Sequence, residues 1–353
     1  MTLAPLDRLK RTLARQPVDR LPVGPYLANW NAQYTGMPFS TYCSEGRAMA
    51  DALLSGWEQV GHDIIFPDAD NYYLAEGFGC QSQLYADNFP TLARPALEDP
   101  QQVFALDVPD PHRDGRMPVY LEATRLVARQ VGDGAVIRVP GTGPFAVASY
   151  FIGVQEFLTE VACIERGIDT TNEAAIERML DLATEAVIRF GLAQIESGAH
   201  ILQCGDSLAS GSMISPATFR RFVLPHHRRI FKVWKEAGAI TALHVCGDNS
   251  RMLDLFAETG ADIVAIDSKV ELGFAKSQIG DRVTLIGNLD PVHVMLEGSE
   301  LQVQAAAEDC IAAAAHDGGY ILGTGCEVPP GTPLENLRTL VRVAHEYRAG
   351  DSE

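Results

Sequence analysis

Eight short apolar runs recur along the chain, and amphipathic segments with helical spacing separate most of them. The runs occupy residues 21–26, 63–66, 135–139, 200–203, 239–244, 262–266, 283–286 and 320–322. Several are almost continuously hydrophobic, which is typical of strands buried on both faces of a parallel sheet. Regular alternation of such strands with helical segments indicates strand–helix–strand crossovers. Eight units of this kind predict an α/β fold, the (β/α)₈ or TIM barrel.

One connection is too long for a single crossover. Residues 71–128 follow the second predicted strand and contain six prolines, Pro90, Pro95, Pro100, Pro109, Pro111 and Pro118. Long, proline-rich connections of mixed character are typical of functional loops and insertions. We therefore predict that 71–128 is an insertion that caps the barrel mouth. Because no interdomain linker is visible, residues 1–353 are expected to form one barrel domain.

The charge balance and the cysteine content exclude several classes of protein. The net charge is −18, from 28 basic and 46 acidic residues, which disfavours nucleic-acid binding because phosphate contacts need a basic face. No stretch of about 18 consecutive apolar residues is present, so no membrane span is expected. The seven cysteines are scattered, and the N-terminus does not resemble a secretory signal. A cytoplasmic protein without a disulfide framework is therefore predicted.

Two short segments at the ends of predicted strands offer a set of metal ligands. His244-Val-Cys246 ends the fifth strand, and Gly323-Thr-Gly-Cys326-Glu ends the eighth. Residues separated by one position lie on the same face of a strand, so His244 and Cys246 can both lean toward the barrel axis. One imidazole and two thiolates suit Zn²⁺ and leave a coordination position for substrate. Asp267, at the end of the sixth strand, is the candidate fourth ligand.

The other strand ends also carry polar residues, and the barrel would bring them to one rim. They are Tyr26, Asn29, Trp30 and Asn31, Asp68 and Asp70, Thr142, Asp206, Asn288 and Asp290, and Glu327. Active sites of such barrels lie at this rim. Asp206 and Asp267 have an alternative reading as helix caps or as acceptors for loop amides.

Several motifs resemble those of the uroporphyrinogen decarboxylase superfamily. They are Arg20-Leu-Pro-Val, Gly143-Pro-Phe-Ala-Val-Ala-Ser-Tyr150, Ile214-Ser-Pro, Phe219 with Val223-Leu-Pro225, Gly287-Asn-Leu-Asp-Pro291 and Pro329-Pro-Gly-Thr-Pro-Leu-Glu-Asn336. The resemblance covers about residues 7–347 and implies the same barrel. His-x-Cys with a distal Gly-Cys-Glu resembles the cobalamin-dependent methyltransferase branch, which includes methylcobamide:coenzyme M and O-demethylase enzymes. By that resemblance His244, Cys246 and Cys326 bind zinc.

Two departures from family patterns refine the expected function. The decarboxylase carries an arginine-rich N-terminal motif, whereas this chain has Tyr26-Leu-Ala-Asn-Trp30 without arginine. No corrinoid-binding domain is recognised in the chain, and the letters Asp-x-His-x-x-Gly occur only inside the 71–128 connection, as Asp110-Pro-His112-Arg-Asp-Gly115. If a corrinoid takes part, it is therefore expected on a separate partner protein.

The resulting hypothesis is a zinc-dependent methyltransferase. It moves a methyl group between a small thiol, methoxyarene or methylamine substrate and the cobalt of a partner-bound corrinoid, in a direction that the sequence leaves open. Asp206 and Asp267 are the predicted catalytic acids, with Asp267 also a metal ligand. Predicted substrate contacts are Tyr26, Asn29, Trp30, Asn31 and Asp70. The alternatives are a metal-free uroporphyrinogen-type decarboxylase and a non-catalytic subunit that binds metal or corrinoid.

Overall fold

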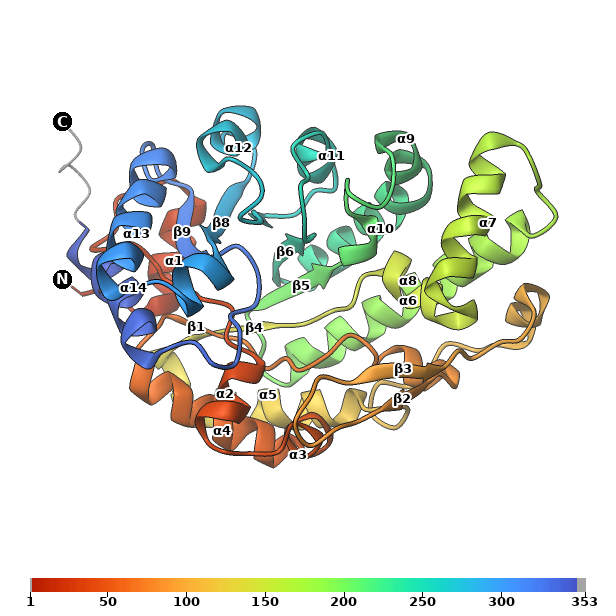
Figure 1. The fold of residues 1–353 in the computed structure, drawn as a ribbon, viewed down its shortest axis with the longest axis horizontal. Coiled ribbons are helices and arrows are strands. Elements are labelled where there is room, and N and C mark those ends of the chain that lie inside the picture. Colours follow the sequence, from red (N-terminus) through yellow and green to blue (C-terminus); the bar gives the residue numbers. More distant parts are fainter. Residues whose placement is uncertain (1, 348–353) are drawn as a thin grey trace.

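A curled parallel sheet forms the centre of the molecule (Figure 1). The computed structural model describes residues 2–347. Seven parallel strands are hydrogen-bonded in the order β1-β4-β5-β6-β7-β8-β9. They are β1 (Ile64–Ile65), β4 (Val136–Val139), β5 (Ile201–Gly205), β6 (Ile240–His244), β7 (Ile263–Ala265), β8 (Thr284–Leu289) and β9 (Tyr320–Thr324). Each coincides with one of the predicted apolar runs.

The remaining predicted strand, 21–26, is reduced to a single bridging residue. Val23 pairs with Leu322 of β9 in parallel, and the Val23 carbonyl accepts a hydrogen bond from Asp63 N at 2.9 Å, just before β1. The segment thus closes the ring between the first and last strands of the sheet. Pro22 and Pro25 flank this contact and have no N–H to donate, so a longer strand ladder cannot form. The predicted barrel is confirmed, but the extent of its first strand is wrong.

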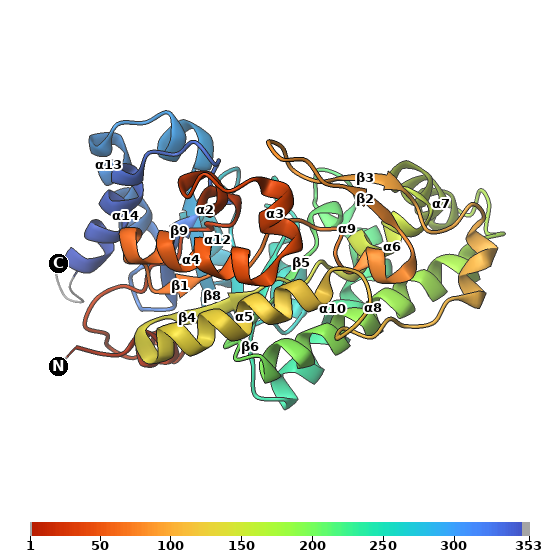
Figure 2. The same ribbon diagram turned by 90° about the horizontal axis from the view of Figure 1, so that it is seen from below.

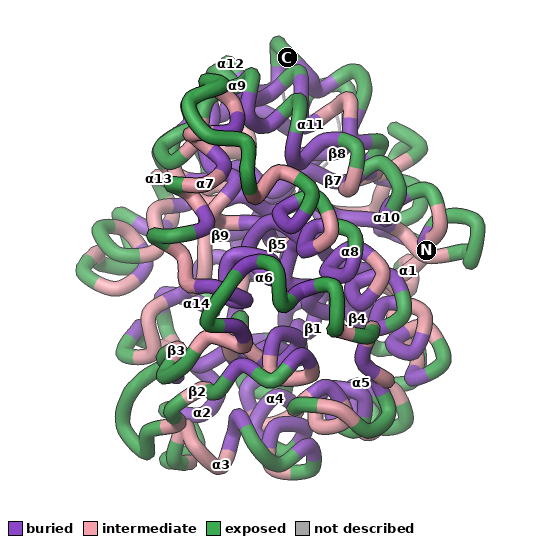
Figure 3. The backbone as a smooth tube through the Cα atoms, turned by 90° about the vertical axis from the view of Figure 1, so that its right-hand side faces the viewer, coloured by how far each residue is buried: buried purple, intermediate pink, exposed green. Residues whose placement is uncertain are grey.

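Helices surround the sheet, so that buried residues gather in the centre and exposed residues at the periphery (Figures 2 and 3). The crossover helices are α4 (Gly46–Val60), α5 (Met117–Val131), α8 (Glu173–Glu196), α10 (Leu224–Glu236), α11 (Leu253–Glu258), α12 (Leu272–Ile279), α13 (Glu300–Ala314) and α14 (Leu334–Glu346), while α1 (Pro5–Leu13) precedes the first bridge. Thr332 and Glu335 resemble a capping box in sequence. In the structure, however, Pro333 is the N-cap residue of α14, without a side-chain cap.

The period-two alternation of the strands divides their side chains into two sets. Ile64, Val136, Ile201, Ala242, Ile263, Ile286 and Ile321 form one apolar layer together with Leu9 of α1. The residues between them, such as Ile65, Ile137 and Leu202, pack in the larger core with the helices. Two residues after Val136, Ile201 and Ala242 of the apolar layer, the same inner face of the strands carries Arg138, Gln203 and His244. The barrel interior is therefore apolar at the α1 end and polar toward the carboxyl ends of the strands.

The connection 71–128 contains short elements of its own. They are η1 (Ala75–Phe78), the antiparallel pair β2 (Gln81–Gln83) and β3 (Thr91–Arg94), η2 (Pro100–Ala105) and the first part of α5. Because α5 is the crossover helix between β1 and β4, the extra material lies before it. The assignment of this stretch as a cap of the barrel mouth stays a prediction.

Other short helices lie outside the basic barrel pattern. They are α2 (Asn29–Tyr34), α3 (Phe39–Ser44), η3 (Gly132–Gly134), α6 (Pro144–Ile152), α7 (Val154–Arg166), η4 (Ser207–Ala209), α9 (Pro216–Thr218), the π-helical η5 (Phe219–Val223) and the π-helical η6 (Pro291–Leu296). Within the described chain, no single helix meets the length and hydropathy needed to cross a bilayer. Only α6 and α7 taken together do so, across a bend of 108°.

Candidate metal centre and active site

Three potential metal ligands meet at the carboxyl ends of β6 and β9. His244 Nε2 lies 3.1 Å from Cys246 Sγ and 3.8 Å from Cys326 Sγ, and the two sulfur atoms are 3.4 Å apart. His244 is the last residue of β6, and the chain turns at Gly247, whose φ is +96°. Cys326 follows β9 after Gly325, where an added Cβ would lie 2.4 Å from Ser268 N. Glycine is needed there because the two backbones approach so closely.

The spacing and chemistry of these atoms fit a zinc ion. Zn–S bonds of about 2.3 Å and Zn–N bonds of about 2.0–2.1 Å in a tetrahedron place neighbouring ligand atoms roughly 3.5–3.8 Å apart. The three distances between ligand atoms lie within a few tenths of an ångström of that range. The His and Cys donor set is also one that zinc prefers over harder oxygen-seeking cations.

The environment of the thiol pair favours the thiolate form of Cys246. Hydrogen bonding from Cys326 lowers the pKa of Cys246 well below its usual value, and His244 and Ser207 act in the same direction against the effect of burial. The hydrogen bond with Cys246, together with burial, raises the pKa of Cys326. Because the thiolate is the form that binds a metal, the pair already stabilises one negative sulfur. Ser207 contributes through a contact of 3.3 Å between its hydroxyl and Cys246 Sγ.

A cavity of about 110 Å³ adjoins this cluster. Its wall is formed by His244, Cys246 and Cys326 together with Tyr26, Asp68, Asn71, Pro140, Gly141, Thr142, Gln203, Gly205, Ser207 and Glu327. The side chains come from strand ends all around the barrel, as expected for a site at this rim. The space is large enough for a small group beside the metal ligands.

Two carboxyl groups belong to the cavity wall, the buried Asp68 and the partly buried Glu327. Tyr26 donates its hydroxyl to Asp68, and the Asp68 carboxylate also accepts Ala69 N at 2.8 Å. Glu327 accepts hydrogen bonds from Asn29 N at 2.9 Å and from Asn29 Nδ2 at 3.0 Å, both on Oε1. Burial raises the pKa of Asp68 to about 6 and that of Glu327 to about 7, because the charged form loses hydration.

The structure gives Asp206 and Asp267 other partners. Asp206 is fully buried and accepts hydrogen bonds from Phe145 N at 3.1 Å and Ala146 N at 2.9 Å, at the start of α6, and its Oδ2 lies 3.0 Å from His227 Nε2. Asp267 accepts Gly247 N at 2.8 Å and Lys269 N at 2.9 Å. In the described chain the cluster of potential ligands contains His244, Cys246 and Cys326 but not Asp267.

The residues predicted to contact substrate fall into three groups. Tyr26 lines the cavity directly, and Asn29 lies one step away, where it holds Glu327. Trp30 is buried, donates to Thr332 O at 2.8 Å and stacks on Tyr34. The side chain of Asn31 binds the backbone carbonyl of Ala28 at 3.0 Å.

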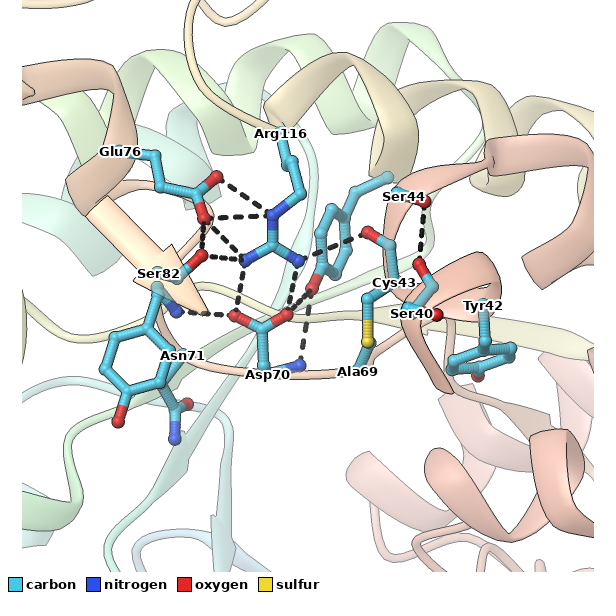
Figure 4. A network of polar contacts seen from close by, with 12 residues as sticks. Ser40, Tyr42, Cys43, Ser44, Ala69, Asp70, Asn71, Glu76, Ser82 and Arg116 are labelled. Atoms are coloured by element: carbon cyan, nitrogen blue, oxygen red, sulfur yellow. Dashed lines mark hydrogen bonds and ion pairs between the residues drawn. The ribbon is translucent and has the colours of Figure 1, made fainter. Parts of the chain in front are cut away.

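Asp70 takes part in a separate network around Arg116 (Figure 4). Arg116 Nη2 lies 2.9 Å from Asp70 Oδ1 and 2.8 Å from Glu76 Oε1, and Arg116 Nη1 donates to Cys43 O at 3.2 Å. Ser82 of β2 also bonds Glu76. This arginine joins the loop after β1, η1, the hairpin and α3 at the base of the 71–128 segment. Asp70 is therefore engaged by Arg116 and is not among the residues that line the cavity.

Sequence reasoning placed Asp68 and Glu327 at the barrel rim without assigning them a role, and it did not name Gln203 or Ser207. Asp68 stands near Asp70, and only the three-dimensional structure shows that Asp68 is the one that lines the cavity, whereas Glu327 lines it together with Cys326. Gln203 and Ser207 carry no motif that would distinguish them. Gln203 could be found from the period of β5, because it lies two positions after the inward-facing Ile201.

Comparison with known proteins agrees with this architecture. The family model described as uroporphyrinogen decarboxylase (URO-D) matches residues 4–347. The methylated-thiol–coenzyme M methyltransferase of Methanosarcina mazei is 34% identical over 303 residues, which are 86% of this chain and 77% of that protein. The methylcobamide:CoM methyltransferase MtaA of Methanosarcina barkeri is 29% identical, over 97% of this chain and 98% of its own.

Among solved structures, a methyltransferase from Methanosarcina mazei superposes with a TM-score of 0.87 at 27% identity, and the match covers 98% of this chain and 99% of that one. The chain thus belongs to the uroporphyrinogen decarboxylase family. The predicted branch and enzyme class, the corrinoid-dependent methyltransferases, are confirmed by these relatives.

Proposed function

We propose that this enzyme is a zinc-dependent methyltransferase that transfers a methyl group from the cobalt of a corrinoid, carried on a separate protein, to a small thiol. The observation that carries the proposal is the convergence of His244, Cys246 and Cys326 beside a small cavity at the barrel rim. The relatives support the corrinoid and the thiol, because their names contain methylcobamide and methylated thiol. A cytoplasmic location and a small-molecule substrate are part of the same proposal.

Zinc bound here would hold the substrate sulfur as a thiolate that stays nucleophilic, because two cysteine thiolates and a neutral imidazole leave the ion without net positive charge. In the transfer, the sulfur forms a bond to the methyl carbon. The partner-bound corrinoid would supply the methyl group and would retain the electron pair of the cobalt–carbon bond. The thiol proton leaves for solvent or for a carboxyl of the cavity wall.

The chain's own residues position the reacting groups. Ser207 fixes Cys246 by its contact with Sγ, and Asn29 fixes the carboxyl of Glu327 next to Cys326. Tyr26 and Asp68 also line the cavity, and the ring of Tyr26 lies edge-on to that of His244 with the centroids 6.1 Å apart. The catalytic roles of Asp206 and Asp267 stay predictions. In the structure, the carboxylate oxygens of both residues accept hydrogen bonds from backbone amides.

Metal analysis of purified protein is the first test. We expect about one zinc per chain in the wild type and its loss in Cys246→Ser and Cys326→Ser, because each variant removes one thiolate from the triad. Cys163→Ser is the matched control, since Cys163 is a half-buried thiol on α7 outside the cluster. Equal zinc content in all four proteins would contradict the proposed metal centre.

Turnover is the second test. Zinc-loaded protein incubated with methylcobalamin and a small thiol should produce Co(I), which absorbance detects, together with the methyl thioether. The Cys163→Ser control should retain the rate and Cys246→Ser should lose it. Zinc binding without methyl transfer to any thiol, methoxyarene or amine would instead indicate a non-catalytic metal-binding subunit.

A further inference from the structure

The cavity wall contains a buried amide whose nitrogen has no hydrogen-bond partner among the described residues. The amide belongs to Gln203, which is 3% exposed, and its oxygen accepts a hydrogen bond from the guanidinium of Arg138. We infer that Gln203 donates an N–H to an oxygen of the substrate and thereby selects thiols that carry such an oxygen, with Arg138 as the residue that positions the amide. This inference rests on the proposed methyl transfer to a thiol and specifies the group that accompanies the sulfur.

The chemistry of Arg138 decides which end of the amide faces the cavity. A guanidinium carries only donors, so the atom of Gln203 that meets it is the oxygen. The nitrogen, Nε2, is therefore the end that is turned away from Arg138. It lies toward Gly205, where an added Cβ would be 3.4 Å from Nε2. Because Gly205 also lines the cavity, the amide N–H₂ group borders the space that a ligand would occupy.

The register of the sheet places this donor close to the potential metal ligands. Gly205 of β5 pairs with His244 of β6, and Gln203 pairs with Ala242, two residues earlier. Two strand residues advance about 7 Å, so the backbone of Gln203 lies about that much deeper in the barrel than the backbone of His244. Its side chain extends back toward Gly205. A short thiol whose sulfur binds a metal held by His244 can thus bring a second atom to this amide.

Arg138 is itself fixed in position and stays charged. It is buried on the inner face of β4, and its Cζ lies 4.9 Å from the centroid of the Phe66 ring. Burial lowers the pKa of Arg138 to about 10, against the effects of Tyr26 and Asp68, so the guanidinium is protonated at neutral pH. Hydrogen bonds from a charged donor are stronger than neutral ones. Rotation of the amide, which would bring its nitrogen against the guanidinium, is therefore opposed.

An N–H donor held in this way discriminates between substrates by the acceptor that they carry. A substrate oxygen next to Nε2 satisfies the buried N–H, whereas a methylene group in the same place leaves it unpaired. One neutral hydrogen bond of this kind changes an affinity by about threefold to tenfold. The expected substrates are thiols with an ether, hydroxyl, carbonyl or sulfonate oxygen a few bonds from the sulfur.

Two thiols of equal length test the inference. In 2-methoxyethanethiol the ether oxygen can only accept hydrogen bonds, and 1-butanethiol has a methylene group in its place. Binding of each thiol to the Co²⁺-substituted protein is measured by the sulfur-to-metal absorption, which requires no turnover. The ratio of the two affinities is compared between variants, because changes in folding or in metal loading affect both thiols alike.

Gln203→Glu is the decisive variant, because it keeps the shape of the side chain and its contact with Arg138 but replaces the donor by an acceptor oxygen. We expect the preference for the ether over butanethiol to fall by about threefold to tenfold. Gln83→Glu introduces the same charge on the exposed strand β2 and is the matched control, which should keep the wild-type ratio. An unchanged ratio in folded Gln203→Glu and Gln203→Met would overturn the inference.

Variants of Arg138 test its positioning role. Arg138→Met should lower the ratio as Gln203→Glu does, because the amide is then free to turn, and Arg138→Lys, which retains a charged donor, should restore part of it. A purely structural role of Arg138 would weaken the binding of both thiols alike, and an unchanged ratio would overturn the positioning assignment. If Arg138→Met does not fold, the Gln203→Glu comparison still decides the inference.

Two further outcomes separate the possible sources of the oxygen and the levels of the argument. In Gln203→Met, which adds no charge, weaker binding of 2-mercaptoethanesulfonate relative to butanethiol assigns the donor to a sulfonate oxygen as well, whereas a loss confined to the ether assigns it to neutral oxygens. If no thiol binds the metal-loaded protein, the proposed function itself fails. Turnover with both thiols and an unchanged ratio refutes only the role of Gln203.

Discussion

Replacing Asp206 by alanine should destabilise the protein strongly, because its carboxylate is the shared acceptor of three buried donors. Phe145 N, Ala146 N and His227 Nε2 lie 3.1, 2.9 and 3.0 Å from it, and Asp206 and His227 are both completely buried. Each buried donor left without an acceptor costs about 1–3 kcal/mol. The three losses share one cavity and are not additive. We expect the free energy of unfolding to fall by about 3–5 kcal/mol.

Denaturant unfolding followed by tryptophan fluorescence measures this loss, at fixed protein and zinc concentration. Asp206→Asn retains one acceptor oxygen and should lose less stability than Asp206→Ala. Asp254→Ala is the control, because Asp254 is 71% exposed and pairs only with Arg282 at the surface. Such pairs contribute about 0–1 kcal/mol. A loss below about 1 kcal/mol in Asp206→Ala would refute the reasoning.

The same variants test the catalytic role predicted for Asp206. A general acid contributes about 10²–10⁴-fold to the rate. If Asp206 only fixes the start of α6 and His227, the folded Asp206→Asn protein should keep most of its methyl-transfer rate. A loss of a hundredfold or more in a stable, zinc-loaded variant would show that the acid role is correct.

Three other perturbations have defined outcomes. Arg116→Met should lower the free energy of unfolding by about 3–5 kcal/mol, because it leaves the carboxylates of Asp70 and Glu76 without their cation. Limited proteolysis of this variant should then begin in the β2–β3 hairpin, and cleavage elsewhere would count against the prediction. Gly143→Ala should lower the stability of the fold by about 1–3 kcal/mol, since the new Cβ would lie 2.3 Å from Asp206 Cβ. Gly134→Ala is the control and should lower it less, because the atom nearest to its new Cβ is 3.4 Å away. Thermal melting compares the two variants. Burial raises the folded-state pKa of Asp68 to about 6, so the folded protein binds this proton more tightly than the unfolded chain, and stability falls as pH rises from about 4 to about 7. Relative to Asp68→Asn, the wild type should lose of the order of 3 kcal/mol over that interval; a pH-independent difference between the two proteins would contradict the shift.

The alternation of apolar strands and helices was sufficient to predict the barrel, because strands buried on both faces leave an unambiguous pattern. It overestimated the first strand, where Pro22 and Pro25 limit pairing to Val23. It also left α6 and α7 unassigned, although Gly143 and Gly153 mark where these two helices begin. Hydrophobic periodicity therefore predicted the strands better than it predicted their lengths.

The convergence of His244, Cys246 and Cys326 was the most predictable feature of the candidate site. His244 and Cys246 are two residues apart at the end of one strand, and closing the ring of strands brings Cys326, which follows β9, next to them. The acids were harder to assign. An aspartate at a strand end that binds loop amides, as Asp206 and Asp267 do, has the same sequence context as one that faces the cavity, as Asp68 does. Hydrogen-bond partners distant in sequence decide between these roles.

The closing contact of the ring has a consequence for biosynthesis. Val23 and Leu322 are about 300 residues apart, and Cys326, which completes the cluster, follows directly after β9. A nascent polypeptide that leaves the ribosome N-terminus first exposes an open sheet edge, and lacks its third ligand, until translation is nearly finished. Contacts between such distant residues form slowly because the entropy of loop closure must be overcome first. Messenger RNAs truncated before the codons of β9 should therefore yield products that do not close the barrel and that aggregate or are degraded.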